Sequence, residues 1–461
     1  MPTPRFCLRA AGHAGLFTAF AGVLVYLWSM LCVFPAHSWN AVRLATSFMM
    51  RFGPTPYPGA TEGPLTTWIY GPVPLFLQWP ATWTGDAANA LLAAAVINCA
   101  VLLLPLIMAI RTGGETRLQA LLIAIMLVPA SCWQFWQSDN AAIAFGLLAN
   151  ATLLANTARS TILAVLFTAL AVWSKQTELP LVLAQAGWLV WTRGRGPAVR
   201  YLAICAGFGL TLGILFALRF GLEKFWFNLV TLPGRIPFAP FASKLHDLGP
   251  EFLTYALLPL LLAWKFKAAI RTSPSLALGA MSFLILLPFS IISFFKVGGS
   301  VNSLHPALYL LPGAALGLAG WLAGKFSFAS LVTAGVVVVL CIVKAGPALG
   351  VLQPQTKAIK QGAYLAESLP GSIYMPWNPL LTYFTDHRFY HAEDGLGTRL
   401  AAGFVFTPAS LRAHLPEKLS VVAYAREDPP GFITSLLPAR ARHDRFGEWE
   451  LYSWELAPAK P

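Results

Sequence analysis

Long apolar runs separated by short polar loops dominate the pattern of this sequence. A helix of about 18–22 apolar residues is enough to cross a hydrocarbon core roughly 30 Å thick. The pattern therefore predicts a polytopic α-helical membrane protein with about eleven spans. The predicted spans cover residues 14–34, 88–110, 118–135, 140–157, 160–174, 178–192, 201–219, 251–265, 274–295, 304–323 and 328–345.

Composition agrees with this class. The chain is 57% hydrophobic and only 11% charged, whereas a soluble domain carries about 25% charged residues. The net charge of +13 resides mostly in short loops between apolar runs, which indicates topology and contact with anionic lipids rather than nucleic acid. The six cysteines lie in or beside apolar segments without CxxC spacing, so we expect free thiols.

One aromatic run, TWIYGPVPLFLQWPATW at residues 67–83, departs from the pattern. It contains Pro72, Pro74 and Pro80, with Pro64 just upstream. Proline breaks a helix interior, and tryptophan prefers the membrane interface. We therefore expect residues 65–84 to lie in the interface rather than to form a plain spanning helix, and the other loops on that side to converge on the outer loop 35–86.

Basic residues predict the orientation, because cytoplasmic loops carry an excess of Lys and Arg. With a cytoplasmic N-terminus and a non-spanning 65–84, every short basic loop falls inside; if 65–84 spanned, the loops after it would fall outside. We expect a multi-pass protein of the bacterial inner membrane. The outer face would then hold the loops and turns at 35–86, 133–140, 174–178, 220–250 and 296–306 and the chain after about 346.

The last part of the chain has a different pattern, because charges return after about residue 346. A helix is predicted at 355–369, and GSIYMP, KLSVVAYA and WELYSWEL have the composition of strands. The sequence thus divides into a transmembrane domain, 1–345, and a small extracytoplasmic α/β domain, 346–461.

Two acids on the predicted outer face are candidates for catalysis. Glu62 is the acid of the proline-rich part of the first loop; it fits a general base or metal ligand, and equally a solvated loop residue. Asp139 lies at the start of an apolar helix, where capping of free backbone N–H groups accounts for it as well as a site role does.

Basic and polar residues of the outer turns are candidates for phosphate and sugar contacts. Lys175 lies in the turn WSKQTELP, where the alternative is a local ion pair with Glu178. The turn KVGGSVNSLHP contributes Lys296, Asn302 and His305; an ordinary turn with a snorkelling lysine is the alternative.

The loop 220–250 is amphipathic and aromatic, and we expect it to lie on the membrane and control access of a lipid. Its polar points include Arg235, Lys244, His246 and Asp247. A divalent metal bound by His246, Asp247 and Glu62 is a further hypothesis. The tail segment TDHRFYHAED is rich in ligand-type residues but lacks a metal spacing, so we interpret it as a polar surface turn.

The order of these features resembles that of the GT-C fold glycosyltransferases, in particular the bacterial relatives of the protein O-mannosyltransferases and the lipid A aminoarabinose transferases, glycosyltransferase family 39-like proteins. The resemblance covers the whole predicted membrane part. It rests on one helix followed by a large outer loop, and then on YGPVPLFLQWP, Gly85-Asp86, SDNAAIAFGLL, WSKQTELPLVL and GGSVNSLHPALYLLP.

The resemblance implies that a sugar moves from a polyprenyl-phosphate donor to a glycan, lipid or protein acceptor outside the cytoplasm, by displacement at the anomeric carbon. An acid acts as base, and basic residues stabilise the leaving phosphate. Glu62 and Asp139 would be catalytic. The substrate and phosphate contacts would be Lys175, Lys296, Asn302, His305, Tyr70 and Arg235. No cofactor is implied with certainty.

One departure from the family pattern keeps other functions open. The family carries an acid just after the first helix, where this chain reads FPAHSWNAVR with His37 and Asn40. A lipid-linked sugar flippase or transporter, and a non-catalytic subunit of envelope glycan assembly, are the alternatives. The large outer loop and outer domain favour the enzyme, and the lack of an acid inside an apolar run disfavours an ion-coupled carrier.

Overall fold

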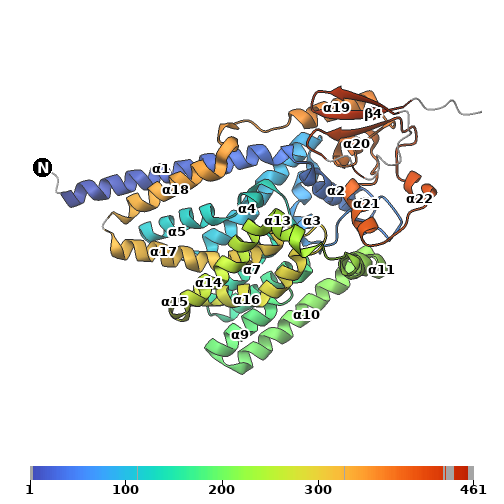
Figure 1. The fold of residues 1–461 in the computed structure, drawn as a ribbon. Helices are drawn as coiled ribbons and strands as arrows, with labels where there is room; N and C mark the ends of the chain where they lie inside the picture. Colours follow the sequence, from blue (N-terminus) through green and yellow to red (C-terminus); the bar gives the residue numbers. More distant parts are fainter. Residues whose placement is uncertain (1–3, 112, 327, 429–430, 432–440, 455–461) are drawn as a thin grey trace, which may run out of the picture.

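The computed structural model describes residues 4–111, 113–326, 328–428, 431 and 441–454. Long helices form a bundle, and a small sheet with its own helices caps one end, at the right of Figure 1. The long helices are α1 (Pro4–Val33), α4 (Ala87–Ala109), α5 (Gly114–Leu127), α7 (Ser138–Leu154), α8 (Ala158–Ser174), α9 (Leu181–Arg193), α10 (Arg195–Phe220), α16 (Pro274–Phe294), α17 (Leu311–Lys325) and α18 (Ala329–Ala345).

Shorter helices fill the connections. They are α2 (Ser38–Phe52), α3 (Val73–Leu77), α6 (Ala130–Gln134), α11 (Leu222–Trp226), α12 (Leu232–Arg235), α13 (Phe241–Phe252), α14 (Leu258–Lys265) and α15 (Lys267–Thr272). A 3₁₀ helix, Val301–Leu310, precedes α17, and π-helical turns, Phe227–Thr231 and Leu253–Leu257, precede α12 and α14.

Within the described residues, five helical segments are long and apolar enough to cross a membrane: Ala10–Ala36, Ala87–Ala109, Arg195–Phe220, Pro274–Phe294 and Val301–Lys325. Many of their side chains face outward, among them Leu210, Leu218 and Ile292, as expected of helices in contact with lipid. The polytopic helical class predicted from the sequence is confirmed. The number of about eleven spans stays a prediction.

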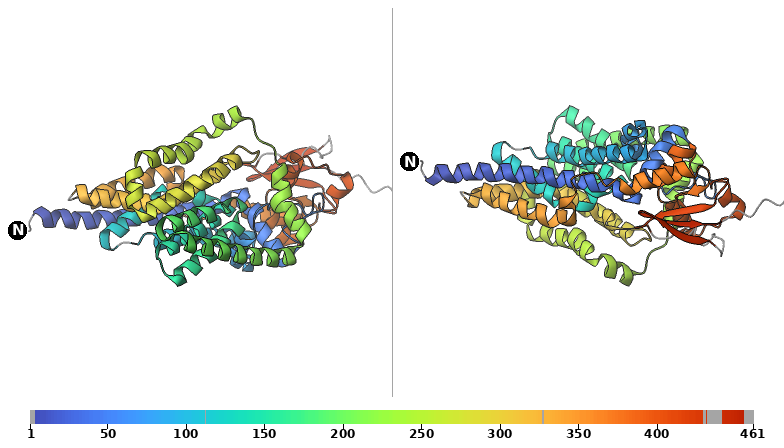
Figure 2. Two further views of the ribbon diagram at one scale, coloured as in Figure 1. Left: turned by 90° about the horizontal axis from the view of Figure 1, so that it is seen from below. Right: turned by 90° about the horizontal axis from the view of Figure 1, so that it is seen from above.

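The bundle packs through an apolar core of small and branched side chains. Helix α1 packs against α18, and α5 packs against α17; the four helices run side by side in Figures 1 and 2. Leu16, Val23, Ala315 and Val337 belong to this core and are almost fully buried. The cysteines agree with the prediction of free thiols: Cys32, Cys99, Cys132, Cys205 and Cys341 are unpaired, whereas the side chain of Cys7 lies outside the described residues.

The proline-rich run does not form a spanning helix, as predicted. It is extended up to Gly71, then forms the five residues of α3 and a 3₁₀ turn, Trp79–Trp83. Such elements are far shorter than the roughly 20 residues that a span requires. Gly71 approaches the backbone of α8 so closely that a Cβ there would lie 1.8 Å from the carbonyl oxygen of Trp173, which places the run directly over the end of α8.

The C-terminal unit, defined here as α19–α22 with β1–β4, contains the helix and strands predicted for this part of the chain. Its helices are α19 (Lys357–Ser368), α20 (Pro379–Asp386), α21 (Glu393–Ala401) and α22 (Pro408–Arg412), and its strands are β1 (Ile373–Tyr374), β2 (Val421–Ala425), β3 (Arg442–Phe446) and β4 (Trp449–Ser453). The strand order is β1-β2-β4-β3, with β1 parallel to β2 and the other pairs antiparallel.

The C-terminal unit is joined to the first loop by a shared core and by backbone hydrogen bonds. Phe48 of α2 packs edge-on against Tyr383 and Phe384 of α20. The amide of Ala392 donates to the carbonyl of Leu65 at 2.9 Å, and the amide of Leu65 donates to Nδ1 of His391 at 3.0 Å. The segment TDHRFYHAED is therefore not simply a polar surface turn, since His391 and Glu393 are buried. His391 packs against Leu65 of this loop, and Glu393 lies beside Tyr424 of β2.

A polar contact at the start of α2 gives this junction a pH dependence. The hydroxyl of Ser38 donates to Asp428, which also accepts from Nδ2 of Asn378 at 3.4 Å. Burial raises the pKa of the Asp428 carboxyl from 3.8 to about 6; the charge of Glu427 adds to the rise, and the two side-chain hydrogen bonds oppose it. The folded state thus binds this proton more tightly than the unfolded chain does.

The stabilisation from protonated Asp428 is fully present below about pH 4 and is lost as the pH rises through about 6. We therefore expect Asp428→Asn, which stays neutral, to be more stable than the wild type above pH 6.5 by on the order of 1–3 kcal/mol. The difference should shrink toward pH 4. Thermal unfolding of both proteins in detergent across this pH range is the measurement, and a difference independent of pH would contradict the assignment.

Candidate active site

A buried ion pair lies at the end of the bundle that faces the first loop. Helices α7 and α8 are neighbours joined by the three residues 155–157, so the first turn of α7 lies beside the last turn of α8. Asp139 lies in the first turn of α7, and Lys175 directly follows the last residue of α8. Their side chains form a direct ion pair. They are only 4% and 7% exposed. Nδ2 of Asn302 donates to the second carboxylate oxygen of Asp139 at 2.9 Å.

Polar side chains from the next turns surround this pair. His305 is 1% exposed and lies with its ring nitrogens 3.5–3.6 Å from the sulfur of Cys132. The hydroxyl of Tyr309 donates to Glu178 at 2.8 Å. The alternative of an exposed Lys175–Glu178 ion pair is not what forms, because Lys175 pairs with Asp139 instead.

Two cations lie close to the ring of Tyr70, which belongs to the proline-rich run and contacts this cluster through Lys175. Nζ of Lys175 lies 5.9 Å from the ring centroid, and the guanidinium of Arg43 lies 5.7 Å from it. Arg43 is also 5.3 Å from the Trp39 ring centroid. In the described part of the chain, the backbone carbonyl of Arg43 accepts from the hydroxyl of Thr46, but its guanidinium forms no hydrogen bond or ion pair. The guanidinium donors are therefore available to an anion.

Sequence reasoning missed Arg43, although a signal for it existed. Trp39 and Arg43 are four residues apart in α2, which places them on one face of the helix. Arg43 also lies on the predicted outer side, against the bias of basic residues toward the cytoplasm.

The structure places the other predicted residues elsewhere. Glu62 has a 64% exposed side chain and forms an ion pair with Lys224 at 2.5 Å. Nζ of Lys296 donates to the carbonyl of Pro233 at 2.6 Å, and Arg235 lies over the Phe404 ring at 5.0 Å. These three are not joined to the Asp139–Lys175 pair by any contact recorded for the described residues.

The hypothesis of a metal bound by Glu62, His246 and Asp247 does not fit the side-chain positions. His246 and Asp247 are exposed and contact each other at 3.1 Å, while Glu62 is engaged with Lys224. Across the described ranges, no group of three or more His, Cys, Asp or Glu side chains is arranged to hold a metal ion. The predicted ligands fail to meet because the loop 220–250 orients them toward solvent.

Comparisons with known proteins give a fold but no close relative. No protein-family model matches the sequence, and no curated protein matches it. Among solved structures, the chain is similar to ArnT from Cupriavidus metallidurans in its crystal structure bound to undecaprenyl phosphate. The TM-score is 0.60 at 13% identity, covering 96% of this chain and 98% of that one. The predicted resemblance is thus confirmed at the level of the fold, which is that of ArnT, a GT-C glycosyltransferase.

Proposed function

We propose that the protein is a glycosyltransferase of the bacterial inner membrane that moves a sugar from a polyprenyl-phosphate donor to an acceptor on the extracytoplasmic face. The observation that carries the proposal is the pair of cations, Arg43 and Lys175, that both lie against the Tyr70 ring, 5.7 Å and 5.9 Å from its centroid. They occur in a fold shared with a protein that was crystallised with undecaprenyl phosphate. A phosphate that leaves as an anion requires preorganised positive charge of this kind.

In this proposal the acceptor hydroxyl attacks the anomeric carbon. The new C–O bond forms as the bond to the phosphate oxygen breaks, and the leaving group departs as the polyprenyl phosphate anion. Arg43 and Lys175 stabilise that anion. Asp139 keeps Lys175 ionised and in place, since it is bound to both Lys175 and Asn302.

The hydroxyl proton passes to a carboxylate. Glu62 and Asp139 are the two candidates, and they differ in their surroundings. Asp139 is already committed to two partners, whereas Glu62 is exposed and has the single partner Lys224. Glu62 would have to leave Lys224 and approach the donor, and an exposed ion pair opposes that movement only weakly; Asp139 is already beside Lys175.

The test is sugar transfer by the purified protein in nanodiscs, with radiolabelled polyprenyl-phosphate sugars as donors and a membrane extract as acceptor. Loss of transfer in Glu62→Gln, with the fold intact, identifies Glu62 as the base; loss only in Asp139→Asn, with binding of undecaprenyl phosphate unchanged, assigns that role to Asp139. No transfer from any donor, together with movement of donor across liposomes, would overturn the proposal in favour of a flippase.

Donor binding can be measured separately from transfer. We expect Arg43→Gln to weaken binding of undecaprenyl phosphate by about 10–100-fold, since a hydrogen bond to a charged group contributes about 1.5–3 kcal/mol and about 1.4 kcal/mol corresponds to each factor of ten. Microscale thermophoresis in detergent would measure the dissociation constant. Arg51→Gln is the matched control, because Arg51 is on the same helix but donates to Thr82. Equal effects of both changes would contradict the role of Arg43.

A further inference from the structure

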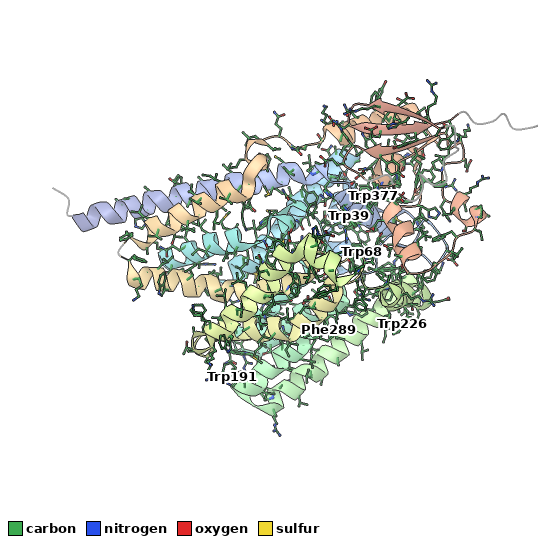
Figure 3. All side chains as sticks on the ribbon, viewed as in Figure 1. Trp39, Trp68, Trp191, Trp226, Phe289 and Trp377 are labelled. Atoms are coloured by element: carbon green, nitrogen blue, oxygen red, sulfur yellow. The ribbon has the colours of Figure 1, made fainter. Side chains whose placement is uncertain are left out.

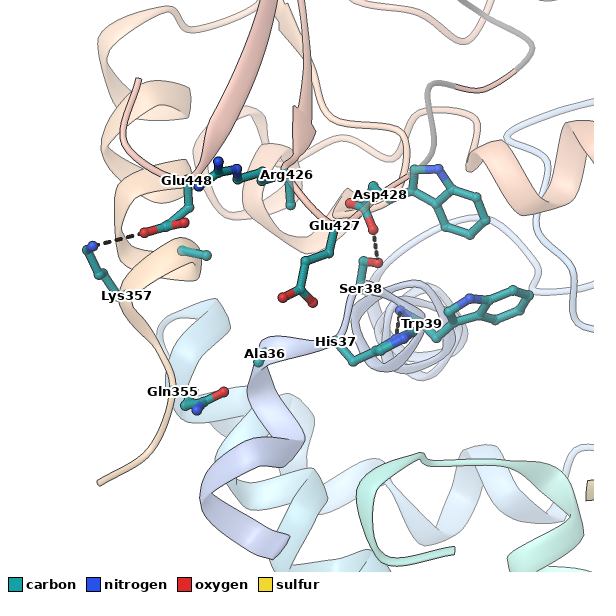
Figure 4. Close-up of a pocket in the computed structure, with 13 residues that line it drawn as sticks. Ala36, His37, Ser38, Trp39, Gln355, Lys357, Arg426, Glu427, Asp428 and Glu448 are labelled. Carbon is teal, nitrogen blue, oxygen red and sulfur yellow. Dashed lines mark hydrogen bonds and ion pairs between the residues drawn. The ribbon is translucent and has the colours of Figure 1, made fainter. Parts of the chain in front are cut away.

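A cavity of about 440 Å³ lies where the start of α2 meets the C-terminal unit (Figure 4). It is separate from the side chains assigned to the donor phosphate. Its walls come from both halves of the chain: Ala36, His37, Ser38, Trp39, Gln355, Lys357, Ala358, Trp377, Ala425, Arg426, Glu427, Asp428 and Glu448. This volume lies within the size of small-molecule sites, about 300–1,000 Å³.

One wall of the cavity is aromatic. The rings of Trp39 and Trp377 lie 5.5 Å apart at an interplanar angle of 50°, and both line the cavity at the junction of the bundle and the C-terminal unit (Figure 3). An aromatic face is electron-rich and the ring is rigid. The C–H bonds on the face of a pyranose are weakly positive, so a sugar ring is a natural partner for such a wall.

The remaining walls carry hydrogen-bonding groups, and among the described residues one of them, Glu427, forms no hydrogen bond or ion pair. Asp428 accepts from Ser38, and Glu448 pairs with Lys357 at 2.9 Å. Glu427 is exposed, and no hydrogen bond or ion pair is recorded for it in the described part of the chain. In Figure 4 its carboxylate extends into the space beside Ala36 and His37. A carboxylate held there accepts hydrogen bonds from hydroxyl or ammonium groups.

The charge of the lining selects against anions. It has three carboxylates and two cations, the cations being Lys357 and Arg426. Burial lowers the pKa of the His37 imidazole, so this side chain adds no positive charge at pH 7. A phosphorylated ligand would therefore be repelled here, whereas a neutral or amino-substituted sugar would not.

The cavity adjoins the donor site through a single helix turn. Trp39 lines the cavity, and its ring lies 5.3 Å from the guanidinium of Arg43, which in turn flanks Tyr70. A ligand against Trp39 would thus lie near Arg43, one of the two cations assigned to the leaving phosphate. In the proposed reaction, the acceptor must approach the anomeric carbon from a position beside the donor phosphate.

We propose that this cavity binds the saccharide part of the acceptor, and that this saccharide is neutral or amino-substituted rather than phosphorylated. The inference rests on the proposed function, because it names the acceptor class for that same reaction. Trp39 and Trp377 pack against the ring, and Glu427 accepts hydrogen bonds from its hydroxyl or amino groups.

The experiment is saturation-transfer NMR on the full chain in nanodiscs, with D-glucosamine, methyl α-D-glucopyranoside and glucosamine 6-phosphate at equal concentrations. We expect saturation transfer to the first two probes, and a signal several-fold weaker for the phosphate. Trp377→Ala should remove most of the signal, and Glu427→Gln, an exposed change that leaves the fold intact, should reduce it several-fold. Trp83→Ala is the matched control, because Trp83 is 68% exposed and lies outside the cavity.

Each outcome bears on the inference. Equal signals for glucosamine and its phosphate, no signal with any probe, or a signal unchanged by both Trp377→Ala and Glu427→Gln would overturn it. Binding of undecaprenyl phosphate, measured on the same sample, separates the two proposals. Saccharide binding without lipid binding would support the cavity while the proposed function fails, and lipid binding without saccharide binding would overturn the cavity alone.

Discussion

Lys175→Met is expected to abolish sugar transfer and to lower the free energy of unfolding by about 3–5 kcal/mol. The change leaves the Asp139 carboxylate buried without its cation. Removing one partner of a buried ion pair is costly, because the remaining charge has lost its water and gains nothing in return. Transfer is lost for a second reason, since Lys175 is one of the two cations beside Tyr70. A radiochemical transfer assay and thermal unfolding in detergent measure the two effects.

A second substitution separates stability from function. Lys175→Met combined with Asp139→Asn removes the stranded charge and keeps an acceptor for Asn302, so most of the lost stability should return while transfer stays absent. Lys224→Met is the control, because its partner Glu62 is exposed and the cost should stay below about 1 kcal/mol. Recovery of transfer in the double variant would show that the pair has a structural role alone.

The bundle was predictable because hydrophobic length and period depend on local sequence. Helix α19 at Lys357–Ser368 and strand β2 at Val421–Ala425 fall within the segments predicted for them. The proline-rich run was also recognisable, since Pro72 and Pro74 exclude a long helix. What local pattern could not give is the insertion of Leu65 into the C-terminal unit, where it pairs with Ala392, because that contact joins residues more than three hundred positions apart.

The candidate site was predictable in part, because the outer helix ends can be located from the local sequence. Asp139, Lys175, Asn302 and His305 were each singled out by their place at an outer helix end, and the structure brings them together. Glu62 met the same criterion but lies at an exposed pair. A position on the outer face says only which side a residue is on, and packing of α7 against α8 decides which of these residues meet.

The second large effect is expected at the contact between the first loop and the C-terminal unit. Arg399 of α21 is fully buried, and its Nη1 donates to the carbonyl of Thr66 at 2.8 Å. Its Nη2 donates to Oδ1 of Asn228 at 3.2 Å and to the carbonyl of Gly59 at 3.4 Å. Burial lowers the pKa of this guanidinium to about 10, so it remains charged at pH 7 and ties three segments together.

Arg399→Met should therefore cost about 3–5 kcal/mol, because it leaves these carbonyl and amide oxygens buried without a donor. The loss is measurable by thermal unfolding with a thiol-reactive dye, since Cys32, Cys132 and Cys341 are buried and free in the folded state. Arg388→Met is the matched control: Arg388 pairs with Glu417 at 2.9 Å on the surface, and its loss should cost below about 1 kcal/mol.

The order in which parts of the Arg399→Met protein unfold tests the same contact. If Arg399 couples the first loop to the C-terminal unit, its removal should lower the temperature at which that junction opens. The junction should then open at a lower temperature than the apolar core around α1 and α18. Access of the dye to Cys32, which ends α1 beside the junction, should then precede access to Cys132 in single-cysteine variants. Equal stability of Arg399→Met and Arg388→Met would show that the shared apolar core, with Phe48 against Tyr383, holds the two parts together without the guanidinium.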